Sequence, residues 1–512
     1  MGKIISGDRI LSLDQLNDRA ARAATGLASL GVKRGDLIAL YLRNDLPFFE
    51  ATFAAGLLGA YPTPVNWHYA EAEARYLFEN SGAQAIIIHA DLIPAIQAAL
   101  PENIPVLVVA TPPEIAAAYG IEAAPVPDGM IDWASWLEGF APFAAPEADA
   151  PGTVIYTSGT TGHPKGVRRN QPTAEQMAMS RKVGAQSFGF AGWLDCPDQI
   201  ITVMTGPMYH SAPNSYGIAA ARLGATVILE ARFDPEELLA MIERHRVTHI
   251  HMVPIMFSRL LRLPAGVKAR YDLSSLKFVV HGAAPCSVPV KRAIIEWWGP
   301  VINEYYGSTE VGIVVTSTSE QWLAHPGTVG RPIDEAEVRI IDADNNSLPP
   351  GEIGEVIARI AGTADFTYHG DDAKRQASEK VGLITPGDIG YLDADGFLYL
   401  CDRAKDMIIS GGANIYPAEI EAELQKMPGV ADCAIFGIPD EDFGEAVCAA
   451  VQPLPGANLS ETVVRTHLRG LMAGYKIPKR VDFHLELPRE DSGKIFKRKL
   501  REPFWIGLDR RI

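Results

Sequence analysis

The chain has 512 residues, of which 47% are hydrophobic and 21% charged, so a large core and more than one domain are expected. The formal net charge of −16 argues against general nucleic-acid binding, which needs a basic face. The five cysteines form no CxxC pair, which indicates neither a zinc site nor a disulfide framework. No apolar run of about 18 residues and no secretory signal is found, so we expect a cytoplasmic protein. The sequence leaves the oligomeric state open between monomer and homodimer.

Patterns typical of helices and strands alternate over the first 400 residues. Ser12 and Gln15 form a capping box that predicts a helix to about Leu30, and residues 45–60 predict a second helix. Apolar runs predict buried strands at 36–42, 83–90, 105–110, 226–231, 248–254 and 277–282. This alternation predicts an α/β fold in which helices cover parallel-rich sheets.

The later part of the chain changes character twice. Residues 334–404 contain short strand patterns and closely spaced turns, which predict a small β-rich subdomain within an N-terminal domain of residues 1–404. Residues 405–512 then alternate helix and strand patterns again, and their number suits a compact α+β domain.

The stretch YTSGTTGHPKG at 156–166 combines hydroxyl groups, glycines and one lysine. Glycines let backbone N–H groups approach a ligand, and with hydroxyls and a cation they form a concave anion site suited to polyphosphate. Pro164 and Gly166 break the common GxxxxGK[ST] nucleotide motif, and a plain surface loop is the alternative. The candidate phosphate-binding residues are Thr157, Ser158, Gly159, Thr160, Thr161, Gly162 and Lys165.

Further motifs follow in a fixed order. They are PMYHSAP (207–213), HGAAP (281–285), YYGSTE (305–310), a TPGD…DRAKD block (385–406), SGGANIYPAEIE (410–421) and PREDSGKIFKRKL (488–500). With the loop at 156–166, they resemble the adenylate-forming enzymes: acyl-CoA synthetases, luciferases and the adenylation domains of peptide synthetases. The resemblance extends from about residue 10 to the C-terminus.

Several roles follow from this resemblance at the nucleotide end of the site. Tyr306 would stack on adenine, Thr309 would bond a phosphate and Glu310 would hold Mg²⁺, and the chemistry agrees because aromatic faces suit purines and carboxylates suit magnesium. Asp388 would bind both ribose hydroxyls and Arg403 the ribose or a phosphate. The adenine would also contact backbone at Ala283, Ala284 and Pro285, where the family more often has glycine at the first position.

The C-terminal motifs imply a moving domain. By resemblance, Lys405 is the hinge, Gly411 and Gly412 line the tunnel for the pantetheine arm of CoA, and Lys494 is the catalytic lysine of adenylation. The plainer interpretations are a linker lysine, a glycine turn before a helix and a solvated basic tail.

His210 follows a strand pattern and would lie beside the carboxylate or the adenylate, although a core histidine is the alternative. The acyl pocket would be mostly apolar with a few hydroxyls, and its candidate residues are Ser211, Met252, Val253, Tyr305, Gly307 and Val314.

These features predict an AMP-forming acid–CoA ligase that uses ATP, Mg²⁺ and coenzyme A. A carboxylate attacks the α-phosphate and releases pyrophosphate, and the CoA thiol then displaces AMP. We expect an aromatic acid of the hydroxycinnamate or benzoate type, such as ferulate, with a medium- or long-chain fatty acid as the second candidate. Three different classes of protein stay open: a peptide-synthetase adenylation unit, for which His210 replaces the expected acid, a luciferase-type oxygenase and a non-catalytic nucleotide- or acyl-binding protein.

Overall fold

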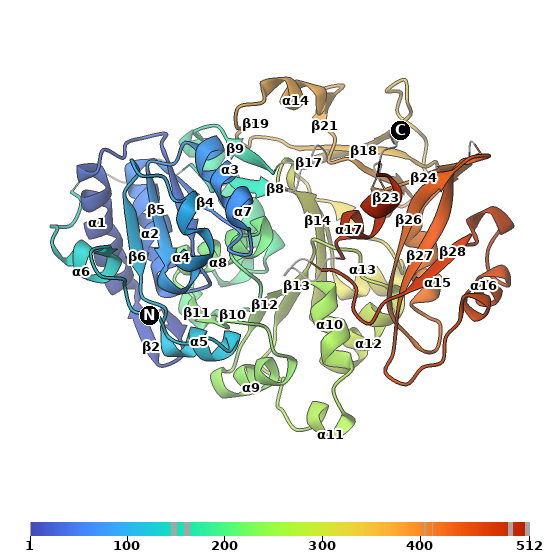
Figure 1. The fold of residues 1–512 in the computed structure, drawn as a ribbon, viewed down its shortest axis with the longest axis horizontal. Helices are drawn as coiled ribbons and strands as arrows, with labels where there is room; N and C mark the ends of the chain where they lie inside the picture. Colours follow the sequence, from blue (N-terminus) through green and yellow to red (C-terminus); the bar gives the residue numbers. More distant parts are fainter. Residues whose placement is uncertain are drawn as a thin grey trace.

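The computed structural model describes residues 2–144, 151–157, 164–403, 406–411, 413–489 and 495–506. Within these ranges the strands form five sheets, packed into a larger N-terminal lobe and a smaller C-terminal one (Figure 1). Among the described residues, no helix combines the length and the apolar character needed to cross a membrane. The predicted α/β class with parallel-rich sheets is confirmed.

A five-stranded parallel sheet lies near the N-terminal end of the larger lobe. Its strands, in spatial order, are β4 (Tyr61–Pro64), β3 (Leu37–Tyr41), β5 (Ala85–His89), β6 (Val106–Val109) and β7 (Ile131–Asp132). The central strands are apolar on both faces because helices cover both sides. The helices of this region are α1 (Leu13–Ser29), α2 (Leu46–Leu58), α3 (Glu71–Ser81), α4 (Ile93–Ile96), α5 (Pro113–Tyr119) and α6 (Trp133–Glu138).

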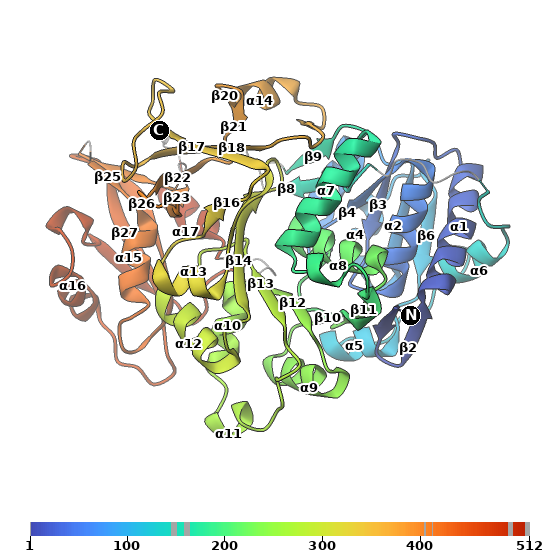
Figure 2. The same cartoon turned by 180° about the vertical axis from the view of Figure 1, so that it is seen from behind.

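A nine-stranded sheet runs through the centre of the molecule (Figure 2). Its spatial order is β16 (Arg331–Pro332), β15 (Gly312–Ser317), β14 (Ile302–Ser308), β13 (Phe278–His281), β12 (His249–Met252), β10 (Ile201–Met204), β11 (Thr226–Leu229), β1 (Lys3–Ser6) and β2 (Arg9–Ser12). The strands from β14 to β1 are parallel, and antiparallel strands flank them at both edges.

Two helical layers bury this sheet. Helices α7 (Ala174–Ser187) and α8 (Ser211–Leu223) contribute to the hydrophobic core on one face. The other face packs against α9 (Pro235–His245), α10 (Pro254–Leu261) and α12 (Val288–Trp298), with α11 (Ala265–Lys268) and α13 (Ser319–Ala324) nearby in the chain. The carboxyl ends of the parallel strands therefore meet at one edge, where α/β proteins bind ligands.

Short antiparallel strands follow, as the turn-rich sequence of this region predicts. They are β17 (Ala336–Ile341), β18 (Gly354–Ile360), β20 (Glu379–Lys380), β21 (Leu383–Ile384), β22 (Asp388–Leu392) and β23 (Leu398–Arg403), with helix α14 (Asp372–Ala377) before β20. Strand β19 (Phe366–Tyr368) instead pairs with β9 (Lys165–Arg169), which pairs with β8 (Ile155–Thr157). This three-stranded sheet joins the ends of the predicted phosphate loop to a segment about 200 residues later in the chain.

The C-terminal lobe has its own sheet and core. It contains β24 (Ile408–Ser410), β25 (Ala413–Ile415), β26 (Val430–Asp440), β27 (Gly444–Pro453) and β28 (Arg480–Phe483), with α15 (Pro417–Leu424), α16 (Glu461–Arg469) and α17 (Lys497–Arg501). Its core includes Ile420, Val447 and Val464, all buried. Ala404 and Lys405 lie outside the described residues, so the division of the chain at 404/405 stays a prediction.

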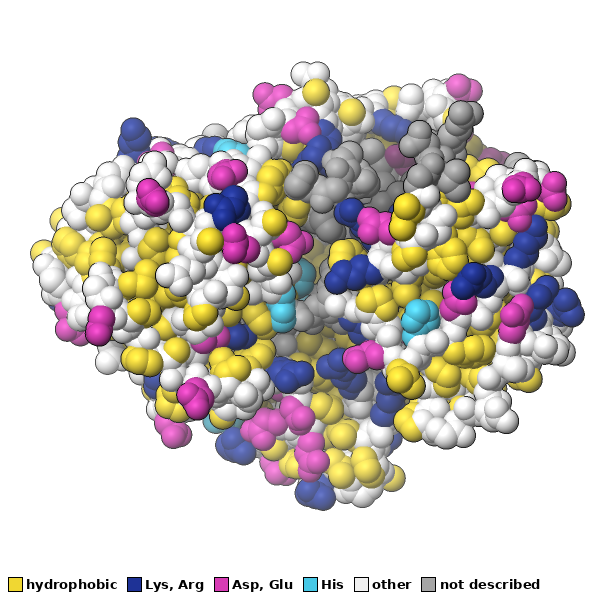
Figure 3. Space-filling view, in the orientation of Figure 1, with side chains coloured by type: hydrophobic (Ala, Val, Ile, Leu, Met, Phe, Trp, Pro, Cys, Tyr) yellow, Lys and Arg dark blue, Asp and Glu magenta, His cyan; other side chains and the backbone are white. Residues whose placement is uncertain are grey.

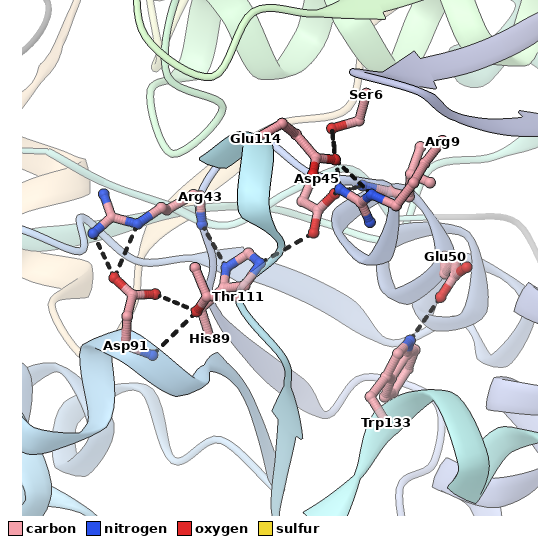
Figure 4. Close-up of polar contacts among 11 residues, drawn as sticks. Ser6, Arg9, Arg43, Asp45, Glu50, His89, Asp91, Thr111, Glu114 and Trp133 are labelled. Atoms are coloured by element: carbon pink, nitrogen blue, oxygen red, sulfur yellow. Dashed lines mark hydrogen bonds and ion pairs between the residues drawn. The ribbon is translucent and has the colours of Figure 1, made fainter. Parts of the chain in front are cut away.

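A buried polar network joins the two large sheets of the N-terminal lobe (Figure 4). Asp45 precedes α2 and is fully buried; its carboxylate accepts hydrogen bonds from the Leu46 amide (2.7 Å) and from Arg9 (2.5 Å) on β2. His89, at the end of β5, lies 3.2 Å from the second carboxylate oxygen. The Arg43 amide donates to His89 Nδ1, so Nε2 carries the proton that His89 donates to Asp45. One carboxylate thereby fixes β2, β5 and the start of α2 relative to one another.

Asp45→Asn is expected to lower the free energy of unfolding by about 1–3 kcal/mol, because the buried amide group would turn a donor toward the Arg9 or His89 donors and leave it unsatisfied. Burial opposes ionisation of Asp45, but His89 and Arg9 outweigh it and lower the pKa below the ordinary value. The stabilisation is therefore present above about pH 4, the ordinary range of the group, and is lost as the pH falls through the lowered pKa.

Urea unfolding followed by tryptophan fluorescence measures this loss. Asp18→Asn is the control, because Asp18 pairs with Arg22 on the surface of one helix and should change stability little. Equal effects of the two substitutions would show that the network does not hold the sheets together.

Candidate active site

A cleft of about 3100 Å³ opens at the carboxyl ends of the central parallel strands. We call it the central cleft; its walls include residues that follow β10, β12 and β13, the end of β14, the three-stranded sheet and the segment 495–501. Figure 3 shows a hollow between the two lobes, with lysine, arginine and histidine side chains at its margin. Most of the predicted site motifs border this cleft.

Asp388 connects two of the predicted nucleotide-binding residues. The Tyr306 hydroxyl donates to one carboxylate oxygen of Asp388 at 2.7 Å, and Arg403 Nε lies 2.7 Å from the other. The pairing of β22 with β23 places Asp388 opposite Arg403, and Arg403 also donates to the Pro386 carbonyl oxygen at 3.2 Å. Burial lowers the pKa of Arg403, but Asp388 more than offsets this and raises it. The guanidinium therefore stays charged, and its contact and that of Tyr306 hold the carboxylate at the cleft.

Glu310 and Thr309 form a turn that two unpredicted residues hold in place. The Tyr368 hydroxyl donates to a Glu310 carboxylate oxygen at 3.0 Å. The pKa of Tyr368 is raised, mainly by burial and next by the negative charge of Glu310. Arg169 Nη2 donates to the backbone carbonyl oxygens of Thr309 (3.1 Å) and Glu310 (2.9 Å). Burial lowers the pKa of Arg169. The sequence offered one signal for Arg169, namely the two adjacent arginines Arg168 and Arg169 shortly after the predicted phosphate loop at 156–166.

Lys165 lies at the start of β9, where β8 and β9 pair and bring the two ends of the loop together. Its ammonium group is 2.5 Å from the Asp371 carboxylate, and Thr157 borders the cleft beside it. Lys374 adds a second cation, whose ammonium group lies 4.6 Å from the ring centre of Tyr368. The pKa of Lys374 is lowered mainly by burial and next by the nearby charge of Lys165. The rest of the predicted loop lies outside the described residues: Ser158, Gly159, Thr160, Thr161 and Gly162.

The segment at the end of β13 borders the cleft with Ala283, Ala284 and Pro285. Ala283 has a φ of 65°, which places a residue with a Cβ in the left-handed region. Gly282 leaves room for the ring of Tyr305, because a Cβ at position 282 would lie only 2.6 Å from that ring.

All but one of the predicted acyl-pocket residues border the central cleft. Five of them border the central cleft, as does His210, directly before α8: Ser211, Met252, Val253, Tyr305 and Gly307. The prediction that Val314 lines the acyl pocket was wrong. Val314 is fully buried in a core cluster with Val356 and Leu398 and does not border the cleft. Its neighbour Ile313 borders the cleft instead, because successive strand residues point to opposite faces.

The C-terminal lobe reaches the cleft through the segment 495–501. Lys497 pairs with Glu421 on α15 at 2.8 Å. Burial acts to lower the pKa of Lys497, but the carboxylates of Glu421, Asp402 and Asp406 outweigh burial and raise it. Gly411 lies elsewhere: it has a φ of 57°, donates its amide to the Phe443 carbonyl oxygen and is not among the residues that border the cleft. In this part of the chain, three more predicted residues lie outside the described ranges: Lys405, Gly412 and Lys494.

Comparison with known proteins agrees with this geometry. Residues 3–365 match the family model described as AMP-binding enzyme, and residues 419–494 match the AMP-binding enzyme C-terminal domain. A feruloyl-CoA synthase of an Amycolatopsis species is 32% identical over 506 residues, which cover 97% of this chain and 95% of that protein. The long-chain-fatty-acid–CoA ligase FadD13 of Mycobacterium tuberculosis is 30% identical over 513 residues, with 98% and 94% coverage.

The fold has a solved counterpart as well. ATP-bound MatB from Rhodopseudomonas palustris superposes with a TM-score of 0.83 at 26% identity, covering 98% of this chain and 96% of that one. The chain belongs to the AMP-binding enzyme family, which confirms the resemblance to adenylate-forming enzymes. It is an AMP-forming acid–CoA ligase.

Ala283→Gly is expected to stabilise the protein by about 0.5–1 kcal/mol, because glycine adopts a positive φ without the Cβ penalty. Ala284→Gly should have the opposite sign, since Ala284 is not in the left-handed region and glycine there mainly adds freedom to the unfolded chain. Thermal unfolding of the two variants measures the difference. A loss of stability in both would show that Ala283 is not strained.

Proposed function

We propose that this ligase activates a compact aromatic carboxylic acid of the hydroxycinnamate or benzoate type. The observation that carries the proposal is the aromatic wall of the acyl pocket. Phe188 and Tyr305 border the cleft and pack edge to face, with ring centres 6.4 Å apart, and both are more than nine-tenths buried. Such rings offer a flat acid favourable offset or edge contacts. The feruloyl-CoA synthase among the relatives supports the same class.

A medium- or long-chain fatty acid is the second candidate, and a separate observation favours it. The cleft continues between α1, α2, α7 and α8, where its walls are largely apolar: Leu13, Phe53, Leu57, Phe143, Ile218 and Leu223. A hydrocarbon chain would bury apolar surface along this extension. The fatty-acid ligase among the relatives is consistent with it.

In the first reaction step the acid and the α-phosphate are both anions, so the barrier is electrostatic and positional. We assign Lys494 to the charge between the carboxylate and the α-phosphate, and Lys165 with the loop to the leaving pyrophosphate. Asp388 would accept the ribose hydroxyls, because it borders the cleft and Tyr306 and Arg403 hold its carboxylate there.

The Glu310 carboxylate fits a magnesium site. It borders the cleft beside Thr309, and Arg169 and Tyr368 fix the turn that carries it. A hard carboxylate together with phosphate oxygens is the ligand set that Mg²⁺ prefers in ATP-dependent enzymes. Bound there, the ion would supply positive charge to the phosphate oxygens.

The second step needs a route for the CoA thiol. We propose that the C-terminal lobe turns at Lys405, exchanging Lys494 for Gly411 and Gly412 at the cleft. Two observations support this: the segment 495–501 borders the cleft, whereas Gly411 lies away from it.

AMP release that depends on both acid and CoA tests the substrate class. Cinnamates and benzoates are expected to have a kcat/KM at least about tenfold above fatty acids of six to sixteen carbons, because the aromatic wall favours flat rings. Release of AMP and formation of the thioester would be quantified by liquid chromatography. A higher kcat/KM for fatty acids would replace the aromatic assignment, and no AMP from any acid would favour a non-catalytic binding protein.

Lys494→Ala is expected to lower ATP–pyrophosphate exchange at least about 100-fold, as removal of one electrostatic stabiliser does. Thioester formation from supplied acyl-AMP should fall far less, because that step no longer involves the α-phosphate attack. Lys426→Ala, which removes an exposed lysine paired with Glu423, is the control. Equal loss of both half-reactions would contradict the assignment of Lys494 to the first step.

A further inference from the structure

The far wall of the acyl pocket contains a polar pair that the sequence motifs did not indicate. His251 on β12 and Tyr305 on β14 both border the central cleft, and their side chains are hydrogen-bonded, with 2.8 Å between Nε2 and the hydroxyl oxygen. The residues are only 2% and 6% exposed. The pair therefore lies at the wall of the cleft and is shielded from bulk solvent.

The pair forms across an intervening strand. Strand β13 lies between β12 and β14, and His251 is in register with Val280 on it. Gly282, at the end of β13, has no side chain, and a Cβ there would lie 2.6 Å from the Tyr305 ring. The glycine of the HGAAP motif thus gives the phenol room to reach across β13 to the imidazole.

The surroundings keep both rings in place and uncharged. Phe188 packs edge to face on Tyr305, Tyr216 lies 5.5 Å from the imidazole centre, and Thr205 donates to the His251 carbonyl oxygen at 3.1 Å. Burial lowers the pKa of His251 to about 4 and raises that of Tyr305. Both groups are therefore neutral near pH 7.

A neutral imidazole–phenol pair can reverse its polarity. In one tautomer the phenol donates to the imidazole, and the phenol oxygen accepts a hydrogen bond from a ligand hydroxyl; in the other the imidazole donates to the phenol, which donates to a ligand carbonyl. A charged ligand group would lose its hydration without gaining a counter-ion. Tyr305 lies roughly 10 Å along β14 from Ser308, where the strand ends and the turn with Thr309 and Glu310, the predicted phosphate and magnesium residues, begins.

We propose that His251 and Tyr305 together select acids that carry a neutral hydroxyl or carbonyl group at the end far from the carboxylate. The inference rests on the proposed function, since it assumes that the acyl group enters this part of the cleft. The two residues act by contacting the acyl group and take no part in bond making.

The test compares 4-hydroxycinnamate with 4-methylcinnamate, which have similar shapes but differ in hydrogen bonding. The wild-type protein is expected to prefer the hydroxyl compound by about tenfold or more in kcat/KM for AMP release, because its analogue leaves the pair unmatched. Tyr305→Phe should bring the ratio close to one, mainly through the hydroxyl compound. It should leave the KM for ATP far less affected than the acid preference.

Tyr216→Phe is the matched control. Its hydroxyl bonds Thr202 within the same aromatic cluster, and its side chain is fully buried and does not border the cleft. It should keep the wild-type ratio. Equal rates for the two acids in the wild type, or equal shifts in the two variants, would overturn the proposal.

Failure of the proposed substrate class gives a different result. If neither cinnamate yields AMP but fatty acids do, the aromatic assignment fails, and the same ratio is measured with 12-hydroxydodecanoate and dodecanoate. A preference for the hydroxyl acid that Tyr305→Phe removes then supports the pair, whereas equal rates overturn it.

Discussion

The carboxylate of Asp388 holds three separate segments of the chain at the edge of the central cleft. It accepts a hydrogen bond from Tyr306 on the nine-stranded sheet and pairs with Arg403, the last described residue before 406. A buried carboxylate is stable only with such partners, so the β-rich region, the central sheet and the approach to the C-terminal lobe are fixed together. The position of the predicted ribose site follows from this one group.

Local charge in the cleft differs from the charge of the whole molecule. The net charge is −16, yet the reaction handles a polyphosphate. Arg403 and Lys497 border the cleft, each paired with a carboxylate, Asp388 and Glu421, and Lys165 beside it pairs with Asp371. These pairs keep the cations ordered and limit their repulsion, and an arriving anion must compete with the carboxylates. Arg169 instead donates to backbone carbonyl oxygens and serves to shape the turn at Glu310.

Two adjacent tyrosines divide the site between its two ligands. Because successive residues on a strand point to opposite faces, Tyr306 packs with the β-rich region and reaches Asp388, while Tyr305 packs with Phe188 and reaches His251. The nucleotide end is therefore rich in charge, and the acyl end is aromatic and neutral. One strand supplies both environments within two residues, which allows an acid and a phosphate to meet at its end.

The sequence by itself determined the fold class, most of the strands and helices, and the motifs that converge on the cleft, because these depend on local periodicity, capping and turn chemistry. The α1 helix begins after the predicted capping box, and motif residues from Thr157 to Arg403 border one cleft. Only the tertiary structure decided which face each strand residue occupies, so Val314 was misplaced by one residue. It also decided the partners of the site residues: Asp371, Arg169 and His251 lie 206, 141 and 54 residues from Lys165, Glu310 and Tyr305. Such contacts depend on how distant strands are ordered and registered, which no local pattern specifies.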